Sequence, residues 1–523
     1  MGERENGGIS AKHLVVMFAV IIVLFFSFDT RGLRRAAAVA PPPASAAAGE
    51  AYLSRSMRQL RARRARVFTL PDESPHKRKL LSAPYDIVMV GAGLSGGVLA
   101  ERFARLTGAR VLIIDRRDHI GGNCYDYIDE ESGILVNKYG AHLFHTDLSR
   151  VWDYVTSMHS WERYDHQVLA RVDGRLVPVP VNINTVNALL NLTIKDEVEM
   201  RAWLKGVQVR PEHGGEPRNS REMALSRVGT DLYKKIFEPY TRKQWDKDPS
   251  ELAPGVTARI PVRDNFDNRY FSDRYQALPA GGYTAFFESL LTVPNVTVLL
   301  ETDFFKVRPL LNPSAKIFYT GPIDAYFSDK GLGKLEYRSI RFAREFYPNH
   351  GLVQPVSVVN YPQDETECGF SDCRFTRVVE YKHYYNQKSP HSVTFREYSS
   401  DQGDPYYPVP NQNNMDLYNQ FKQLAAQEKG VYFVGRLANY KYFNMDQAID
   451  NALDVFAQTL CDVRPESEAC QAQRAGTKLP YDRDGGSPAP AAPVGGAPAG
   501  GLAGGGGAMD KAVATAWRSP SDD

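Results

Sequence analysis

The sequence predicts an α/β fold with a doubly wound parallel sheet, into which a helical domain and an antiparallel β-sheet domain are inserted. Residues 85–123 run in the order strand, glycine-rich turn, helix, strand and acidic residue. Residues 186–250 show mostly helical periodicity, and strand-like, aromatic-rich segments dominate 338–400. The chain has 523 residues, of which 43% are hydrophobic. It can therefore bury a large core, and its length suggests about two to four domains.

The glycine-rich turn predicts a Rossmann-like, dinucleotide-binding βαβ unit. Gly91 makes the tight turn, Gly93 lets the backbone approach a pyrophosphate, and Gly96 lets the helix pack closely on the strand. The helix N-terminus offers free N–H groups and a partial positive charge to phosphates. Asp115, 19 residues after Gly96, is placed to accept hydrogen bonds from a ribose. A lone GxGxxG is usually just a turn, but this context predicts a bound dinucleotide.

A second glycine pair follows the acidic strand end. Gly121 and Gly122 stand in the segment HIGGN, which ends at Asn123. Glycines here indicate backbone that runs close to a long ligand, as in flavoproteins that bind FAD in an extended form. The βαβ unit alone allows NAD or FAD, and this segment favours FAD.

The N-terminal region predicts attachment to a membrane. Leu14 to Phe28 is apolar and uncharged over 15 residues, which is short for a comfortable span. We expect an uncleaved single-pass anchor; a cleaved signal peptide and a buried core helix are the alternatives. The flanking arginines weakly favour a cytosolic body, but a lumenal body in the ER or Golgi stays open. Residues 36–50 resemble an Ala/Pro stalk, and 53–68 form a basic segment that either touches anionic lipid or is a solvated linker.

Charge and cysteine content limit the function classes. The chain carries a net charge of +2, but residues 1–83 hold 14 Lys and Arg against six Asp and Glu. The remainder is therefore mildly acidic, which argues against general nucleic-acid binding. The five cysteines are too few and too irregularly spaced for a disulfide framework or a zinc site, and their odd number leaves at least one free thiol.

Two further segments are expected to lie against the cofactor. The segment KYGAHLFHT carries His142 and His145, which could be metal ligands; no third ligand cluster completes such a site, so we expect no metal and a loop against the flavin. Near the C-terminus, GVYFVGR predicts a buried strand that enters Gly435 and Arg436. A helical run from Asp446 to about Cys461 follows it.

Several segments together are similar to the UDP-galactopyranose mutase family of the bacterial type. They cover about 85–460 in family order, and outside the segments quoted above they are YTRKQW (240–245), RIPVR (259–263), FDNRYFSDRYQALPAGGYT (266–284), IFYTGPIDAYF (317–327), LEYRSIRF (335–342), TRVVEYKHY (376–384), DPYYPV (404–409) and GRLANYKYFNMDQAI (435–449). The resemblance implies an isomerase that interconverts UDP-galactopyranose and UDP-galactofuranose. It also implies that FAD is active when reduced, and that its N5 attacks the anomeric carbon while UDP leaves and later returns.

The resemblance assigns roles to individual residues. Arg259 and Arg377 are similar to the family's pyrophosphate arginines, since fixed cations stabilise a departing diphosphate; without the resemblance, surface ion pairs would be the simpler interpretation. The other substrate-side residues that it implies are the phosphate-holding Tyr270, Tyr407 and Tyr442, the uracil-stacking Tyr240 with Thr241 and His166, and Trp245 and Glu397 near the sugar. Ordinary core packing is the alternative for these aromatics. On the flavin side, it implies Gly91, Gly93, Gly96, Asp115, Gly121, Gly122, Asn123, His142, His145, Gly435, Arg436 and Met445.

The sequence departs from the family pattern at two positions. Asn444 stands where bacterial relatives carry an aspartate that orients the site, so hydrogen bonding is kept but a charge is lost. His166 stands where some relatives have asparagine near the uridine. Because neither change touches Arg259 or Arg377, we still expect activity, with Asn444 as a candidate for an altered rate or pH dependence.

Two other functions remain as alternatives. An FAD-dependent oxidoreductase of the amine-oxidase type would share the βαβ start and the C-terminal Gly-Arg segment but would need no paired arginines. A catalytically inactive, membrane-tethered flavin scaffold would not need to retain Trp245, Arg259 and Arg377. We also expect UDP-galactose as the substrate and a homodimer as the oligomeric state.

The expected domain organisation follows from these assignments. It comprises an N-terminal anchor, stalk and basic linker (1–83), an FAD-binding domain (84–165 with 276–335 and 413–463), a β-sheet domain (166–185 with 336–412), a helical substrate-capping domain (186–275) whose loop 252–263 is a mobile lid, and a disordered tail (464–523). We expect the active site in the cleft between these domains.

Overall fold

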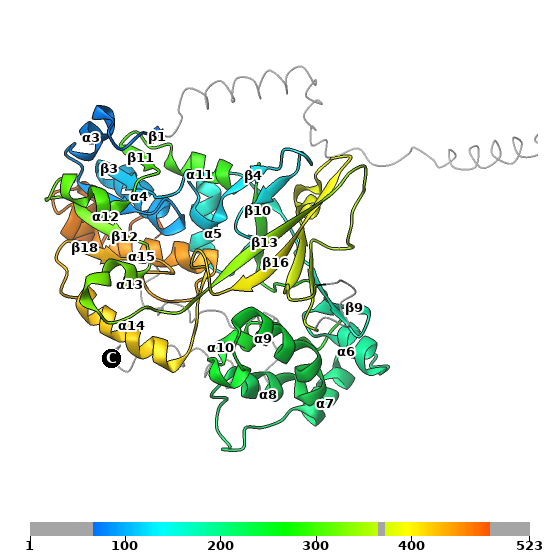
Figure 1. Cartoon of the computed structure of the whole chain (residues 1–523). Coiled ribbons are helices and arrows are strands. Elements are labelled where there is room, and N and C mark those ends of the chain that lie inside the picture. Colours follow the sequence, from blue (N-terminus) through cyan, green and yellow to red (C-terminus); the bar gives the residue numbers. More distant parts are fainter. Residues whose placement is uncertain (1–65, 364–371, 482–523) are drawn as a thin grey trace, which may run out of the picture. The chain divides into compact units, whose positions relative to one another are not determined.

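The computed structural model describes residues 66–363 and 372–481 (Figure 1). A six-stranded sheet forms one side of this part of the chain, with strand order β1-β11-β3-β2-β12-β18, and every pair in it is parallel. Its strands are β1 (Arg66–Thr69), β2 (Ile87–Val90), β3 (Val111–Ile114), β11 (Val296–Leu300), β12 (Lys316–Tyr319) and β18 (Val431–Phe433). The predicted doubly wound α/β domain is thus confirmed.

Both faces of this sheet are buried, which explains why its strands are continuous apolar runs rather than alternating ones. Ile87 and Met89 point into one core cluster and Val88 into the other. Among the helices that contribute to the first cluster are α4 (Leu94–Thr107), α11 (Tyr283–Leu291) and α15 (Met445–Val463). Those of the second cluster are α3 (Pro75–Leu81), α12 (Phe304–Val307), α13 (Ile323–Tyr326) and α14 (Gln412–Ala425).

A second, mostly antiparallel sheet has the order β17-β13-β16-β15-β14-β8-β9. Only its β14–β8 pair is parallel. The long β13–β16 ladder, visible at the centre of Figure 1, pairs Ser339 with Ser400 at one end and Tyr347 with Ser392 at the other. The strands are β8 (Val168–Val172), β9 (Arg175–Val179), β13 (Tyr337–Tyr347), β14 (Val358–Asn360), β15 (Arg377–Glu380), β16 (Ser392–Ser400) and β17 (Tyr407–Pro408).

A helical unit lies below the β13–β16 ladder in Figure 1, and α9 contacts β16. Its first three helices start at side chains that accept backbone N–H groups, namely those of Asn182, Asp196 and Asn219. The unit consists of α6 (Ile183–Leu190), α7 (Glu197–Val207), α8 (Ser220–Leu232), a π-helical turn (Tyr233–Phe237), α9 (Glu238–Trp245) and α10 (Gly255–Ala258). The helical structure expected for most of 186–250 is therefore present.

Smaller elements complete the described part of the chain. Two short sheets have the orders β6-β10-β7 and β4-β5. Their strands are β4 (Asp126–Ile128), β5 (Leu135–Asn137), β6 (Phe144–Thr146), β7 (Trp161–Arg163) and β10 (Tyr275–Pro279); the remaining helices are α5 (Ser149–Met158), α16 (Glu468–Arg474) and the 3₁₀ turns Gly122–Cys124, Pro249–Glu251, Arg308–Leu310, Ser328–Lys330 and Tyr381–Asn386.

The structure corrects the expected start of the folded body. Residues 1–83 were expected to be anchor, stalk and basic linker, but Arg66–Thr69 forms the edge strand β1, which pairs with β11 from Arg66 opposite Thr297 onward. A four-residue, mostly exposed edge strand has little apolar periodicity, so the sequence gives it no clear signal. Leu14 to Phe28 lies outside the described residues, and within those residues no helix is long and apolar enough to cross a membrane.

The expected C-terminal tail is also corrected. Residues 464–523 were predicted to be disordered, but α16 lies within them and a disulfide joins Cys461, on α15, to Cys470, on α16. Tyr481 then packs its ring 5.2 Å from the guanidinium carbon of the buried Arg102.

Cys373 is disulfide-bonded as well, and the free, buried cysteine among the described residues is Cys124. The irregular spacing of the cysteines in the sequence therefore gave no indication of these disulfides.

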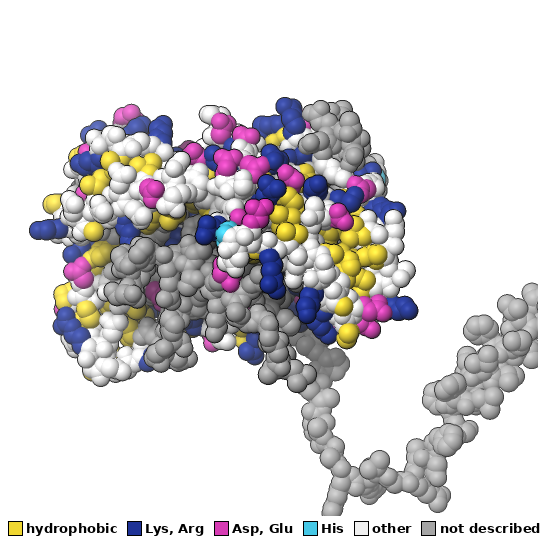
Figure 2. All heavy atoms as spheres, turned by 90° about the horizontal axis from the view of Figure 1, so that it is seen from below, with side chains coloured by type: hydrophobic (Ala, Val, Ile, Leu, Met, Phe, Trp, Pro, Cys, Tyr) yellow, Lys and Arg dark blue, Asp and Glu magenta, His cyan; other side chains and the backbone are white. Residues whose placement is uncertain are grey.

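The surface view in Figure 2 shows no field of a single charge sign. Where described atoms are visible, Lys and Arg side chains lie among Asp, Glu and apolar side chains. Interspersed charges of both signs are usual on a protein surface, and this face offers no broad field of one sign for steering a charged partner.

Removing the Cys461–Cys470 cross-link should destabilise the body without changing its fold. Closing a loop of this length is expected to contribute about 2–3 kcal/mol to the free energy of unfolding. We expect Cys461→Ser, Cys470→Ser and the double variant to lower the thermal midpoint by similar amounts, measured by circular dichroism. A double variant that loses nothing, or peptide mapping that shows both thiols free, would contradict the cross-link.

Candidate active site

Two backbone turns approach each other at the carboxyl ends of β2 and β3. Gly91 has a φ of +113°, and a Cβ atom there would overlap the hydroxyl of Thr320. A Cβ on Gly96 would overlap the carbonyl oxygen of Gly91, and a Cβ on Gly122 would lie 2.9 Å from the Cα of Gly93. These turns leave room only for glycine, so their N–H groups can come close to an extended diphosphate. The residues present therefore fit FAD.

Asp115, directly after β3, joins the turn that follows β2 to the segment that follows β3. Its carboxylate accepts hydrogen bonds from the backbone N–H of Ala92, at 2.7 Å, and of Arg117, at 2.9 Å. Asn123 accepts one from the Arg117 guanidinium at 2.9 Å. A carboxylate has about four acceptor sites, so Asp115 retains capacity for the ribose hydroxyl that the sequence assigned to it.

A cavity of about 280 Å³ opens between the FAD-binding unit, the second sheet and the helical unit. Its walls combine segments that are far apart in the sequence. Most of the residues predicted for substrate and flavin contact line it: Asn123, His142, His145, His166, Tyr240, Trp245, Arg259, Tyr270, Arg377, Tyr407, Arg436, Tyr442, Asn444 and Met445. Thr241 and Glu397 are buried beside it rather than among its lining residues.

Arg259 and Arg436 converge on one tyrosine. The Arg259 guanidinium carbon lies 4.6 Å from the ring centre of Tyr442, and that of Arg436 lies 5.2 Å from it. Tyr407 stacks on Tyr442 with ring centres 5.5 Å apart. Burial alone would raise the pKa of the Tyr442 hydroxyl, but the two guanidinium groups outweigh burial and lower it. This end of the cavity is therefore strongly electropositive.

Arg377 is held by Glu397 on the neighbouring strand. The two residues are directly opposite each other in the β15–β16 pairing, and the Arg377 Nε donates to the Glu397 carboxylate at 2.6 Å. Burial would lower the pKa of Arg377, but Glu397 raises it well above its usual value. Glu397 thus affects the cavity indirectly, because it keeps Arg377 charged and fixes the orientation of the Arg377 side chain.

His142, His166 and Tyr240 are electrically neutral at neutral pH. Burial lowers the pKa of His142 to about 4 and that of His166 to about 3. His142 places its Nδ1 2.7 Å from the Gly140 carbonyl, so this nitrogen carries the proton. Burial raises the pKa of Tyr240 to about 12, which keeps its hydroxyl a hydrogen-bond donor.

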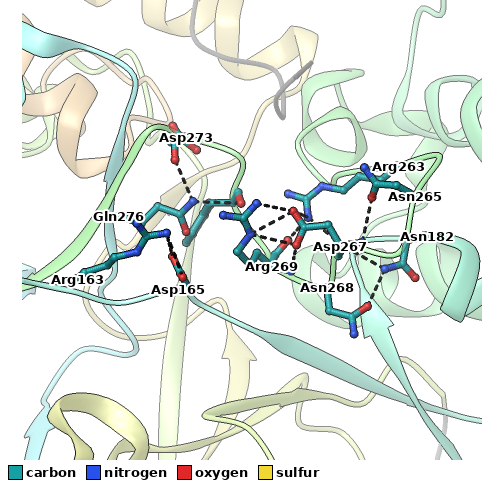
Figure 3. Close-up of polar contacts among 11 residues, drawn as sticks. Arg163, Asp165, Asn182, Arg263, Asn265, Asp267, Asn268, Arg269, Asp273 and Gln276 are labelled. Carbon is teal, nitrogen blue, oxygen red and sulfur yellow. Dashed lines mark hydrogen bonds and ion pairs between the residues drawn. The ribbon is translucent and has the colours of Figure 1, made fainter. Parts of the chain in front are cut away.

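A polar network fixes the segment that carries Tyr270 (Figure 3). Arg263 donates to the carbonyl oxygens of Asp267 and Arg269, and the Asp267 carboxylate accepts from Arg269 Nη2 at 2.8 Å. Asn182, which caps α6, donates to the Asp267 carbonyl at 3.0 Å. The N–H of Tyr270 then donates to the His166 carbonyl at 2.7 Å. Tyr270 is thereby positioned on the cavity wall by contacts from three separate segments.

Arg259 is positioned by the helical unit. It stands at the C-terminal end of α10, in the predicted lid loop 252–263. Arg227, on α8, donates to the carbonyl oxygens of Ala258, at 2.6 Å, and Ile260, at 2.9 Å. In this arrangement the loop faces the cavity and presents Arg259 to Tyr442.

The cavity wall also contains residues that sequence reasoning missed. They are Tyr139, Gln244, Phe271, Asp273, Asn360 and Tyr406 in the lining, and Asp446 directly behind it. Asn360 lies opposite Arg377 in the strand pairing, and Asp446 follows the predicted Met445. Adjacency in the sequence to an assigned residue was the one signal for Gln244, Phe271, Tyr406 and Asp446. Asn360 had no such signal, because only strand pairing places it opposite Arg377.

Comparison with known proteins places these features in a family. The sequence model of a family described as UDP-galactopyranose mutase matches residues 235–442, and that of an NAD(P)-binding Rossmann-like domain matches residues 89–157. The chain is 37% identical over 391 residues to a probable UDP-galactopyranose mutase of Klebsiella pneumoniae, covering 73% of this chain and 97% of that protein. It is 36% identical over 379 residues to a dTDP-fucopyranose mutase of Escherichia coli, covering 70% and 96%.

Solved structures show the same fold. A crystal structure of reduced UDP-galactopyranose mutase superposes with a TM-score of 0.55 at 17% identity, covering 72% of this chain and 95% of that chain. A putative protoporphyrinogen oxidase from Exiguobacterium superposes with a TM-score of 0.51 at 12% identity, covering 73% and 99%. At these identities the likeness concerns the fold alone.

The closely approaching turns that contain Gly91, Gly93, Gly96 and Gly122 are called the glycine cradle here. They provide a matched pair of variants. Gly122→Ala should abolish or strongly weaken FAD binding, because its Cβ would enter the gap to Gly93. Gly108→Ala also places alanine at a positive φ, which costs about 1 kcal/mol, but it points into open space. The flavin content of the purified proteins, measured by absorbance, should therefore fall for Gly122→Ala and stay unchanged for Gly108→Ala. Equal flavin content in both variants would contradict the cradle.

Proposed function

This chain belongs to the UDP-galactopyranose mutase family, and from that premise we propose that it interconverts UDP-galactopyranose and UDP-galactofuranose with reduced FAD. The observation that carries the proposal is the convergence of Arg259, Arg377 and Arg436 on one cavity beside the glycine cradle. In this proposal the FAD-binding unit holds the cofactor, and the helical unit covers the nucleotide.

The arginines match the charge that the reaction develops. When bound, reduced FAD supplies the nucleophile for the anomeric carbon, and UDP is the leaving group. A departing diphosphate gains negative charge, which fixed guanidinium groups stabilise most strongly in a buried site. Arg259 approaches from the helical unit and Arg377 from the second sheet, so both sides of a diphosphate can be bound.

The tyrosines complete the anion site. Burial raises the pKa of the Tyr270 and Tyr407 hydroxyls, so both remain protonated and donate hydrogen bonds to phosphate oxygens. The Tyr442 ring contacts the guanidinium groups of both Arg259 and Arg436, which are attracted to its π face. We propose that Tyr240, Thr241, Trp245 and His166 contact the nucleotide and sugar.

The flavin side is built from neutral groups and one cation. Neutral His142 and the amide of Asn444 contribute hydrogen bonds, and Arg436 contributes a positive charge, anchored by donating to the carbonyl oxygens of Tyr406 and Phe443. A cation at the flavin edge favours a reduced, anionic flavin. We also propose that loop 252–263 opens and closes over the substrate, because Arg259 must release the product.

Substitution of Arg377 tests the anion site. Arg377→Ala should lower kcat/KM about 10²–10³-fold, because it removes a transition-state cation and leaves Glu397 buried without its partner. Arg374→Ala is the matched control, since this arginine is exposed and paired with Asp372. Turnover of UDP-galactofuranose, followed by HPLC, should be lost in the first variant and kept in the second. Unchanged turnover by Arg377→Ala would overturn the assigned role.

The redox requirement separates the mutase from an oxidoreductase. We expect UDP-galactopyranose to form from UDP-galactofuranose with dithionite-reduced enzyme and not with oxidised enzyme, without net consumption of reductant. An amine-oxidase type of enzyme would instead reduce its flavin when substrate is added. Substrate-driven bleaching of the oxidised flavin, together with absence of the isomer, would therefore overturn the proposal.

We further propose that residues 14–28 anchor the protein in a membrane and that the body lies in an oxidising lumen. The apolar run supports the anchor, and the Cys461–Cys470 disulfide supports the lumen, because disulfides persist in oxidising compartments. Carbonate extraction should leave the full chain in the pellet, and protease should spare the body in intact microsomes. Digestion of the body would overturn the lumenal orientation.

A homodimer is proposed from the resemblance alone, and light scattering tests it.

A further inference from the structure

A lysine on α9 joins the helical unit to the second sheet. The ammonium group of the half-buried Lys243 donates to the backbone carbonyl oxygens of Tyr361, at 3.0 Å, and Cys373, at 2.6 Å. It also donates to the carbonyl oxygen of Gln363. An ammonium group has three N–H donors, so it can bind all three carbonyls at once. Tyr361 and Gln363 lie just after β14, and Cys373 lies just before β15. One side chain of α9 therefore holds both ends of the connection between these strands.

The three carbonyl groups belong to residues that other contacts fix. The N–H of Tyr361 donates to the Thr376 carbonyl at 2.8 Å, next to the β14–β15 pairing. The side-chain amide of Gln363 makes two hydrogen bonds with Asp173, in the turn between β8 and β9, at 2.8 and 2.6 Å. Cys373 is completely buried and disulfide-bonded. Because hydrogen bonds from an ionised donor are stronger than neutral ones, this fixed set of acceptors determines where the Lys243 side chain lies.

A second contact holds the same end of α9 on the sheet. The carbonyl oxygen of Gln244 accepts a hydrogen bond from the Ser399 hydroxyl, on β16, at 2.5 Å. The Nε of Arg338, on β13, donates to that hydroxyl at 3.1 Å. Consecutive residues of α9, Lys243 and Gln244, are thus bound by different strands of the second sheet. The last turn of the helix therefore has a defined position relative to that sheet.

This end of α9 also forms one wall of the cavity. Tyr240 and Trp245 line the cavity, whereas Lys243, which stands between them in the sequence, is not among its lining residues. On the sheet side, Asn360 and Arg377 line the cavity and lie directly opposite each other in the β14–β15 pairing. The Lys243 ammonium group consequently joins the helix that forms one wall to the two strands that form another.

Trp245 extends this arrangement to the predicted lid loop. Its side chain is 3% exposed and packs in one apolar cluster with Leu252 and Val256, which both belong to that loop. Tyr442, whose ring contacts the Arg259 guanidinium group, packs against the same cluster. The position of α9 therefore affects the surroundings of Arg259 as well as the nucleotide side of the cavity.

We propose that Lys243 is a positioning residue for the mutase reaction, because its ammonium group sets the distance between the cavity side of α9 and Arg377 on the second sheet. The inference rests on the proposed function, in which Tyr240 and Trp245 contact the nucleotide and sugar while Arg377 binds the diphosphate. Lys243 itself touches neither, and it acts through the backbone carbonyls that it binds. A compact ammonium group with three rotatable donors suits three separate carbonyls better than a planar guanidinium group does.

The first test compares kinetic constants of the FAD-loaded, reduced full chain. Lys243→Met removes the ammonium group and keeps an unbranched side chain. Because the displaced wall contacts the nucleotide in the ground state and the transition state alike, KM for UDP-galactofuranose should rise about tenfold while kcat stays within about twofold. Lys243→Arg keeps the charge and should give an intermediate KM. Lys234→Met is the matched control, since Lys234 is exposed in the adjoining π-helical turn, and it should change neither constant.

The pattern of these constants separates positioning from a general loss of stability. A variant that is merely unfolded in part would show a lower kcat at an unchanged KM, because fewer molecules are active. That result, or an equal KM in wild type and Lys243→Met, would overturn the positioning role. Equal KM values in Lys243→Arg and Lys243→Met would overturn the role of the charge.

Amide hydrogen exchange tests the contact without catalysis. The N–H of Tyr361 and the N–H of Asp246, which donates to the Arg242 carbonyl at the end of α9, lie on the two sides of the contact. In the FAD-loaded Lys243→Met variant, peptides that contain them should exchange about threefold faster or more than in wild type, whereas peptides of α4 should not change. Unchanged exchange on both sides would overturn the contact. If the wild type shows no mutase turnover, the proposed function fails, while the exchange comparison still decides whether Lys243 joins α9 to the sheet.

Discussion

The structure depends on the close approach of two backbone turns at the carboxyl edge of the parallel sheet. Gly93 and Gly122 come so near that a single Cβ atom would close the gap. This approach requires β2 and β3 to be adjacent and parallel, which in turn requires α4 to cross over and pack on the sheet. The short, buried apolar strands, the helices packed on them and the glycine turns all serve that one constraint. An extended diphosphate can bind there because the backbone itself supplies the donors.

The cavity beside this cradle contains several partly buried cations that are oriented by neighbours of quite different kinds. Arg377 has the carboxylate of Glu397. Arg259 and Arg436 lie on tyrosine rings, and Arg436 also donates to backbone carbonyls. Rings and carbonyls orient a guanidinium group without neutralising it. An anionic ligand therefore gains more here than it would at a conventional salt bridge, and this asymmetry is what a diphosphate leaving group requires.

The site is assembled from segments that are far apart in the sequence. Arg227 fixes the loop that carries Arg259, and the Arg263–Asp267–Arg269 network fixes Tyr270 (Figure 3). The second sheet supplies Arg377, and the start of α15 supplies Asn444 and Asp446. Movement of the helical unit would thus change the distance between Arg259 and Arg377 while leaving the cradle intact. Substrate entry and cofactor retention can be controlled separately for this reason.

The sequence by itself determined the βαβ unit, the helical segments near 196–246 and the family, because these depend on local backbone requirements and on contiguous motifs. Gly91, Gly93 and Gly96 are predictable since only glycine fits such a turn. Tertiary structure alone decided that Glu397 faces Arg377, that β1 extends the sheet, that Cys461 meets Cys470, and that Asp273 lies beside His145. Each of these contacts joins side chains whose meeting depends on strand register or on the packing of separate elements. Such contacts carry no periodic signal in the sequence, because their geometry exists only after the chain has folded.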